Sequence, residues 1–381
     1  TNHILHSLMI SREERVFSMS SSYGNRIKVQ IFGQSHSKAI GVVMDGIPAG
    51  IEIDMDKLHG FMERRAPGRN IYSTQRREKD MPEILSGIVD NVTVGAPICA
   101  VIHNTDTRSK DYDNLRDMPR PGHADFPAYV KYQGANDIRG GGHFSGRLTA
   151  PLCFAGNICM QMLEKQGITI GAHIARIQDV MDKPFDPVSI GREELESIKE
   201  KEFPVLDDEK GALMRERIES ARMSMDSVGG TIECAVVGLP AGIGEPIFDG
   251  IENNIAKVTF GIPAVKGIEF GAGFMVSEMK GSENNDEFYY DDEGTIKTYT
   301  NNHGGILGGI SSGMPIIYRV AIKPTSSIAQ KQRSISLSRK ENTILEIKGR
   351  HDPCIVPRAV PVVEAACAIA LLDLLIYERA E

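Results

Sequence analysis

The longest apolar run of the chain covers residues 365–376, and it narrows the choice of fold more than any other segment. It reads from Ala365 to Leu372, continues through Asp373, and ends in three further apolar residues. Because Glu364 and Asp373 bracket the uncharged part of the run, that part is too short to span a bilayer. The run predicts a helix that starts near Val360 and lies inside a core. A chain of 381 residues is long enough to form such a core.

Periodicity in the rest of the chain predicts a mixture of strands and helices. Helices are expected from Asp54 or Asp56 to about Arg65, from about Gly146 to Gln166, and over 192–223. Strands are expected over 27–32, 41–44, 84–89, 96–102, 168–177, 231–237, 267–276, 295–300 and 315–322. The elements do not alternate strictly as βαβ units, which favours an α+β fold over a doubly wound sheet.

Domain organisation follows from the same reading. No repeat of 20–50 residues and no Pro/Ser-rich linker divides the chain, so residues 19–381 are expected to form one domain. Residues 1–18 are mixed and polar, without the apolar stretch of a secretory signal. We interpret them as an N-terminal extension that is either disordered or left over from cloning.

Composition excludes several classes of function. The chain has 51 acidic residues against 43 Lys plus Arg, a net charge of −8, which opposes non-specific binding to nucleic acid or to an anionic membrane. Aromatic residues make up 6% with no Trp, too few for a platform that stacks bases. The six cysteines form no C-x-x-C and no zinc-finger spacing, so we expect a reduced cytoplasmic protein without a metal site.

The common catalytic motifs are missing from the sequence. It contains no Walker P-loop, no G-x-G-x-x-G fingerprint, no H-E-x-x-H and no G-x-S-x-G. Residues 66–82 form instead a long basic loop, and residues 103–145 form a long polar region rich in arginine, histidine and glycine. A stretch of that length without regular structure is usually functional or disordered, and its histidines and aromatics argue against disorder.

Two loop histidines are candidates for proton transfer. His36 follows Gly33 at the end of a predicted strand, and His123 lies in the turn Arg120-Pro-Gly-His-Ala-Asp125. A histidine titrates near neutral pH, and Asp125 could orient the imidazole of His123. A lone histidine such as His36 is more often an ordinary surface or core side chain, so its motif alone carries little weight.

Three other segments suggest that the ligand is a small polyanion. Arg139 and Arg147 enclose three glycines at the start of a predicted helix, where free N–H groups favour an anion. Five arginines (Arg64, Arg65, Arg69, Arg76, Arg77) lie within the segment 64–77, although a solvated basic face would look the same. Lys323 precedes a run of hydroxyl residues that could bind phosphate.

Two segments near the C-terminal end complete the candidate set. Residues 301–313 are rich in glycine and would allow close approach to a flat ring, although a hairpin with a wide turn is the simpler interpretation. Arg350 and Asp352 lie two residues apart in an extended segment and can therefore face one pocket.

Taken together these segments resemble the chorismate synthase family over about Tyr23 to Leu375. Each string alone is weak, but nine in the right order are specific. They are Gly33-Gln-Ser-His36, Ser73-Thr-Gln-Arg-Arg-Glu, Arg120-Pro-Gly-His-Ala-Asp, Asp226-Ser-Val-Gly-Gly, Pro240-Ala-Gly-Ile-Gly-Glu-Pro, Ala264-Val-Lys-Gly, Thr300-Asn-Asn-His-Gly-Gly-Ile, Lys323-Pro-Thr-Ser-Ser and Arg350-His-Asp-Pro-Cys.

The resemblance implies a fold and a reaction. Members of this family pack helices between antiparallel sheets with internal pseudo-symmetry, and they assemble as homotetramers. They are lyases that convert 5-enolpyruvylshikimate 3-phosphate to chorismate, the last common step of the shikimate route to aromatic amino acids. The reaction is a 1,4-elimination of phosphate that needs reduced FMN without net redox change, so NADPH enters only indirectly as a reductant.

The resemblance also implies roles for individual residues. His36 would help to protonate the departing phosphate, His123 would protonate reduced flavin, and Asp352 would lie by flavin N5 and help it accept the substrate proton. The anionic substrate would be bound by arginines, and Arg65 is also the candidate contact to a nicotinamide phosphate. The substrate-binding set is Arg64, Arg65, Arg120, Arg147 and Arg350.

The implied FMN contacts come from five segments. They are His143, Phe144 and Ser145; Pro263 and Ala264; Gly308; Lys323, Pro324, Thr325, Ser326 and Ser327; and Arg350. The family more often has Arg-Ser-Ser where this chain has His143-Phe144-Ser145, and many members have Arg at the position of Ile71. Backbone contacts survive the first change, whereas a contact made by an arginine side chain does not.

Two other functions fit part of the pattern. An FMN oxidoreductase that uses NADPH directly would need a nicotinamide site against the flavin, and no motif indicates one. A non-catalytic protein that binds anions or RNA is opposed by the net charge and by the low aromatic content.

Overall fold

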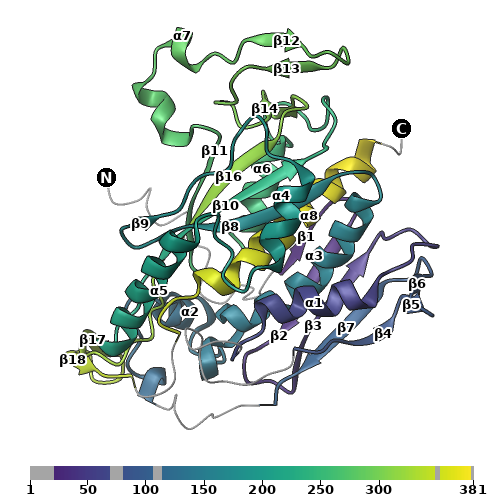
Figure 1. The fold of residues 1–381 in the computed structure, drawn as a ribbon. Helices are drawn as coiled ribbons and strands as arrows, with labels where there is room; N and C mark the ends of the chain where they lie inside the picture. Colours follow the sequence, from purple (N-terminus) through teal and green to yellow (C-terminus); the bar gives the residue numbers. More distant parts are fainter. Residues whose placement is uncertain (1–20, 69–79, 106–113, 348–351, 379–381) are drawn as a thin grey trace, which may run out of the picture.

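Two antiparallel sheets enclose a layer of helices in this protein (Figure 1). The structure is a computed structural model that describes residues 21–68, 80–105, 114–347 and 352–378. The expected extension at residues 1–18 lies outside the described residues. The α+β fold with helices between antiparallel sheets, predicted from the sequence, is confirmed.

Each large sheet has five strands. The first has the order β1 (Ser22–Tyr23), β2 (Lys28–Gly33), β3 (Ala39–Asp45), β7 (Ile98–His103), β4 (Glu83–Ser86). The second has the order β11 (Val265–Phe270), β16 (Ile316–Ile322), β10 (Gly230–Val237), β8 (Thr169–Ile177), β9 (Val180–Met181). Four small hairpins add β5 (Ile88–Val89), β6 (Val92–Thr93), β12 (Phe288–Tyr290), β13 (Ile296–Thr298), β14 (Ile306–Leu307), β15 (Ile310–Ser311), β17 (Gln332–Ser336) and β18 (Glu341–Leu345).

The helices fall into a central layer and a peripheral set. The central ones are α1 (Met55–Arg65), α3 (Thr149–Glu164), α6 (Ile251–Thr259) and α8 (Val356–Glu378). The others are α2 (Asp125–Tyr132), α4 (Arg192–Glu200), α5 (Asp208–Met223) and α7 (Gly281–Asn284), with short 3₁₀ turns at Arg139–Phe144, Gly146–Leu148 and Gly273–Glu278. Asp54 caps α1 by accepting a hydrogen bond from the N–H of Lys57, as a helix start requires.

The two halves of the chain repeat one topology. Without the edge strands β1 and β9, the first sheet reads β2-β3-β7-β4 and the second reads β8-β10-β16-β11. In each half a helix follows the second strand (α1 or α6), and a long helix follows the fourth (α3 or α8). The internal pseudo-symmetry is therefore present in the strand order, although no sequence repeat reveals it.

The helices α3 and α8 meet face to face between the sheets. Residues 149–163 of α3 are all buried, and 94% of the apolar stretch of α8 is buried. By length and composition α8 could cross a membrane, so the prediction that the run is too short to do so was wrong, because the helix begins nine residues before the run. The prediction of a buried core helix is confirmed. A Cβ built on Gly156 of α3 would lie 2.2 Å from the Cβ of Ala365, so the helices touch through a position without a side chain.

Both acids that bracket the apolar run hold other segments onto α8. Asp373 accepts hydrogen bonds from the backbone N–H groups of Asn25, Arg26 and Ile27 at 2.7–2.8 Å. Glu364 accepts hydrogen bonds from both terminal nitrogens of Arg64 and, at 3.0 Å, from the backbone N–H of Ala172 in the second sheet. These two carboxylates therefore tie α8 to segments of both sheets and to α1.

Several predicted element boundaries were wrong. Residues 192–223 form two helices, because Pro204 breaks the helix and its carbonyl accepts from Ile174 at 2.8 Å on β8. The strand expected over 267–276 ends at Phe270 and gives way to a 3₁₀ turn. The last helix begins at Val356 instead of Val360, with Pro357 in its first turn, where proline is tolerated. The region 103–145 is not structureless, since it contains α2 and the turn Arg139–Phe144.

A buried histidine joins two strands of the second sheet. Both ring nitrogens of His173 lie 3.0 Å from carboxylates, Nδ1 from Asp182 and Nε2 from Glu233. Burial alone would lower the pKa of His173, but the hydrogen bonds to these two carboxylates outweigh it and raise the pKa. The imidazole is therefore a cation between two acids.

We predict that Gly156→Ala lowers the free energy of unfolding by about 1–3 kcal/mol, since the added methyl group overlaps Ala365. Gly60→Ala is the matched control: it lies on the exposed side of α1 with no atom within 4 Å of a built Cβ, and it should stabilise by about 0.5–1 kcal/mol. Urea unfolding of both variants measures the difference. Equal effects at the two glycines would contradict the close contact of α3 with α8.

We predict that His173→Gln lowers the free energy of unfolding by about 3–5 kcal/mol at low pH, because two buried carboxylates lose their cation. A raised pKa in the folded state means that this stabilisation is fully present below pH ~6.5, the unfolded value, and is lost as the pH rises through the folded value. Urea unfolding of wild type and variant at several pH values tests it. If the difference in free energy of unfolding between wild type and variant grows as the pH rises, the charged state of His173 is contradicted.

Candidate active site

Two consecutive glycines bring the candidate histidines together. Gly140 and Gly141 have φ of +59° and +86°, in the left-handed region. A Cβ on Gly140 would lie 2.5 Å from Nδ1 of His36, and one on Gly141 would lie 3.2 Å from Nε2 of His123. Both rings therefore pack against one turn of backbone, and only glycine leaves room for them there.

The turn that carries His36 is fixed on both sides. The N–H of Ser35 donates to the carbonyl of Gly142 at 3.1 Å. The side-chain amide of Asn104 donates to the carbonyls of Gln34 and Ser37 at 3.2 and 2.8 Å. His36 is thus held between the end of β2 and the glycine turn.

His123 belongs to a charged cluster at the start of α2. Its Nδ1 lies 2.6 Å from Asp125 Oδ1, which leaves Nε2 facing Gly141. Arg120 donates to both carboxylate oxygens of Asp125 at 2.7 and 2.8 Å. Burial would raise the pKa of Asp125, but hydrogen bonds from Arg120 and His123 hold it well below its usual range. An ionised Asp125 therefore orients the imidazole, as the sequence suggested.

Arg65 and Arg147 share a carboxylate that the sequence analysis did not identify. Asp80 Oδ2 pairs with Nη1 of Arg65 and Asp80 Oδ1 with Nη1 of Arg147. The side chains of Arg65, Arg147 and Asp80 are 3%, 4% and 0% exposed. In the sequence Asp80 is one of two acids, with Glu78, at the end of the basic loop 66–82, and no pattern distinguishes it.

The predicted arginines differ in what they contact. Arg64 is bound to Glu364 of α8 at 2.7 and 3.0 Å, away from the Asp80 cluster. Arg65 also donates to Thr149 Oγ1 and to the carbonyl of Gly146. The predicted contact of Arg65 with a nicotinamide phosphate stays a prediction. Arg69, Arg76, Arg77, Arg350 and the Ile71 position lie outside the described residues.

The segment Lys323–Ser327 joins the His123 cluster to Asp352. Ser326 Oγ donates to the carbonyl of Gly122 at 2.8 Å, and Arg120 Nη1 donates to Ser327 Oγ at 3.1 Å. Thr325 Oγ1 donates to the carbonyl of Asp352 at 2.9 Å, while the carboxylate of Asp352 pairs with Arg358 at 2.8 Å. These predicted residues are therefore neighbours in the folded chain.

Lys323 has the surroundings of a phosphate-binding cation. Its N–H donates to the carbonyl of Ala264 at 2.9 Å, and its Nζ donates to Ser326 Oγ at 2.9 Å. Burial and the nearby Lys266 lower the pKa of Lys323. No carboxylate in the described part of the chain forms an ion pair with it, so the cation and hydroxyls fit an anionic group such as the phosphate of FMN.

The tripeptide after the three glycines is engaged with the protein itself. His143 Nδ1 lies 2.7 Å from the carbonyl of Gly33, and its Nε2 lies 2.5 Å from Ser21 Oγ. The ring of Phe144 lies 6.5 Å from that of Tyr132, and Ser145 Oγ accepts from the N–H of Arg147 at 3.3 Å. His143 thus supports the turn that carries His36.

Gly308 does not reach the other predicted residues within one chain. The hairpin β14–β15 adjoins the start of β16, where Ile317 donates to Gly304 at 3.3 Å. Lys323 follows the other end of β16, which has seven residues. At ~3.3 Å per residue the two ends of this strand lie about 23 Å apart. Figure 1 shows β14 far from α2 and β17–β18.

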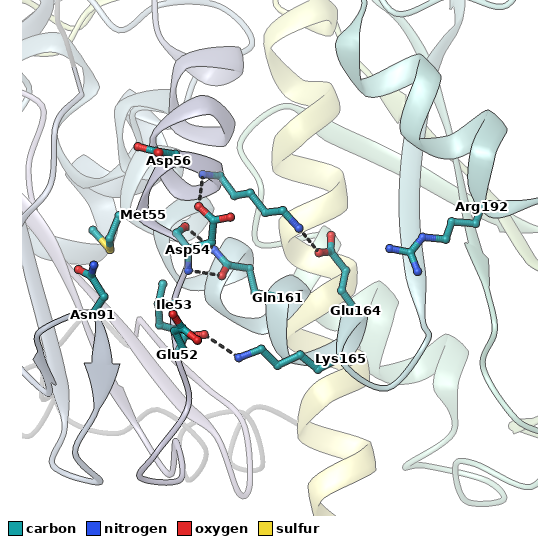
Figure 2. Close-up of a pocket in the computed structure, with 11 residues that line it drawn as sticks. Glu52, Ile53, Asp54, Met55, Asp56, Asn91, Gln161, Glu164, Lys165 and Arg192 are labelled. Atoms are coloured by element: carbon teal, nitrogen blue, oxygen red, sulfur yellow. Dashed lines mark hydrogen bonds and ion pairs between the residues drawn. The ribbon is translucent and has the colours of Figure 1, made fainter.

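A separate pocket of about 650 Å³ lies at the opposite end of α3 (Figure 2). Among its charged side chains Lys57 pairs with Glu164 at 3.0 Å, and Lys165 donates to the backbone carbonyl of Glu52 at 2.7 Å. The lining, which comes from the described part of the chain, includes none of the predicted site residues. We therefore assign the chemistry to the histidine and arginine cluster.

Comparisons with known proteins agree on one family. The family model described as chorismate synthase matches residues 27–376. A curated relative from Lancefieldella parvula with that name is 45% identical over 368 residues, 94% of this chain and 96% of the relative. One from Pyrococcus abyssi is 48% identical over 359 residues, 93% of this chain and 98% of the relative. A solved structure titled as chorismate synthase superposes with a TM-score of 0.72 at 28% identity, covering 93% of each chain.

Proposed function

This chain belongs to the chorismate synthase family, and we propose that it makes chorismate by eliminating phosphate from 5-enolpyruvylshikimate 3-phosphate with reduced FMN. Membership makes it a lyase of the shikimate route to aromatic amino acids. The elimination mechanism, the flavin and the roles of individual residues are our proposal.

The observation that carries the proposal is the convergence of His36 and His123 on one glycine turn. Two proton-transfer groups beside an arginine cluster suit a reaction in which an anionic leaving group departs and protons move. His36, His123, the glycine turn and Arg65 come from segments that lie far apart in sequence, which supports a shared site.

Each residue then has a separate task. His36 donates a proton to the departing phosphate. Asp125 keeps Nδ1 of His123 occupied, so that Nε2 is the nitrogen that holds the exchangeable proton. Asp352, with its charge balanced by Arg358, assists removal of the C6 hydrogen. Arg120 and Arg350, together with the Arg65–Arg147 cluster, supply positive charge for the substrate anions.

The residues around Lys323 would hold FMN. The chemistry that a bound reduced FMN would supply is transient electron donation without net redox change, and NADPH would serve only to reduce the flavin beforehand. Lys323, Ser326 and Ser327 supply the cation and hydroxyls for its phosphate, and Ala264 lies directly beside them.

We propose a cytoplasmic homotetramer without nucleic-acid or membrane partners. Phe248 and Phe274 are each 83% exposed, and both belong to the part of the chain that connects β10 to β16 in sequence. Other apolar side chains of this part, such as Ile247 and Tyr290, are also exposed. A second copy of the chain that covered this region could also supply Gly308 to the flavin site of its neighbour.

The function is tested by an anaerobic assay with chemically reduced FMN and purified 5-enolpyruvylshikimate 3-phosphate. Many turnovers per reduced flavin, with release of phosphate and chorismate, are expected. Consumption of one reductant per product would instead indicate an FMN oxidoreductase. Repeating the assay with oxidised FMN and NADPH shows whether the protein reduces its own flavin.

We predict that His36→Ala and His123→Ala each reduce kcat by about 10²–10⁴-fold, the usual contribution of a general acid or base. Both rings pack against the backbone of Gly140 and Gly141 and not in the hydrophobic core, so we expect both variants to stay folded. Thermal melting checks this. Near-normal turnover in both variants would remove the roles assigned to them.

We predict that Asp352→Asn slows the chemical step while FMN binding changes little. The carbonyl of Asp352, which Thr325 holds, remains in this variant, and only the carboxylate is lost. Single-turnover kinetics and a flavin titration separate the two quantities. A loss confined to flavin affinity would show that Asp352 serves binding alone.

A further inference from the structure

Asp80 lies at the meeting point of the two segments that fix the active-site turn. One carboxylate oxygen pairs with Arg65 and the other with Arg147, and all three side chains are buried. Burial alone would raise the pKa of Asp80, but the two guanidinium groups outweigh it and keep the pKa below its usual value. The carboxylate is therefore an anion shared by two cations.

The two arginines continue toward the catalytic histidine along separate routes. Arg147 Nε donates to Asn104 Oδ1 at 3.0 Å, and the amide nitrogen of Asn104 donates to the carbonyls on either side of Ser35 and His36. Arg65 donates to the carbonyl of Gly146 and to Thr149 Oγ1 at 2.9 and 3.0 Å, where the glycine turn enters α3. One route ends at the turn of His36, and the other ends at Gly146 and Thr149, between the glycine turn and α3.

The backbone at Asp80 is itself held in an uncommon conformation. Its φ of +47° lies in the left-handed region, which few residues other than glycine adopt. Such a conformation persists only where surrounding contacts hold it, and the two ion pairs of Asp80 are contacts of this kind.

We propose that Asp80 is a positioning residue that sets the distance between His36 and the glycine turn through Arg147 and Arg65. The inference rests on the proposed function, since it names the residue that aligns its general acid. Without Asp80, the two guanidinium groups repel each other at close range, and the turns that they hold move apart.

The test uses Asp80→Ala and the isosteric Asp80→Asn, which keeps the shape should the alanine variant fail to fold. Glu233→Gln is the control, because it also breaks a buried ion pair, and its carboxylate contacts His173, Phe185 and Arg319, none of which is assigned to the reaction. We expect kcat of the Asp80 variants to fall about 10- to 100-fold, as misplacement of a reacting group does. The Glu233 variant should lose stability while keeping its kcat.

A double-mutant cycle separates positioning from general loosening. In a His36→Ala background, the Asp80 substitutions should cause no further loss of kcat, because the group they position is gone. Independent, multiplying losses would overturn the proposal.

A chemical readout keeps this inference distinct from the proposed function. Diethyl pyrocarbonate should modify His36 several-fold faster in the Asp80 variants than in wild type, with the exposed His103 as an internal reference. Unchanged reactivity of His36 would overturn the positioning role. Absence of chorismate formation in the wild type, with faster modification in the variants, would overturn only the proposed function.

Discussion

A guanidinium group is costly to bury unless a carboxylate accompanies it, and this requirement organises the protein from its core to its active site. Arg64 is inside because Glu364 is there, Arg120 because of Asp125, and Arg65 and Arg147 because of Asp80. Each pair joins segments that are distant in sequence or fixes a loop at a helix start. The positive charge that an anionic substrate needs is therefore kept in place before any substrate arrives.

The platform for these pairs is the contact between α3 and α8. Gly156 lets the two helices approach closely. Glu364 binds α8 to α1 and β8, and Asp373 binds it to the segment before β2. The site lies where α3 begins, at the point where the glycine turn enters the helix. A rigid helix pair thus sets the position of loops that would otherwise be free to move.

Much of this arrangement could be predicted from the sequence. Long periodic segments gave the core helices and most strands, and the histidine and glycine motifs gave the active-site turn. The break at Pro204 was visible in the sequence but outweighed by the helical pattern around it. Asp80 was missed because neither of the two acids at the end of the basic loop, Glu78 and Asp80, has a distinguishing pattern, and only the folded chain shows that Asp80 lies between two arginines. The distance from Gly308 to Lys323 likewise depends on which end of β16 the hairpin β14–β15 adjoins, which local patterns do not contain.

The place of α8 in the chain affects how the protein can be made. The two halves repeat one topology, yet they share a single core, and α8 is the last described element to leave the ribosome. Until it emerges, α3, α6 and the strands β8 and β10 of the second sheet lack their partner. The nascent chain therefore carries an unfinished core through most of its synthesis, and chaperones that shield apolar surface have the longest opportunity to act on it.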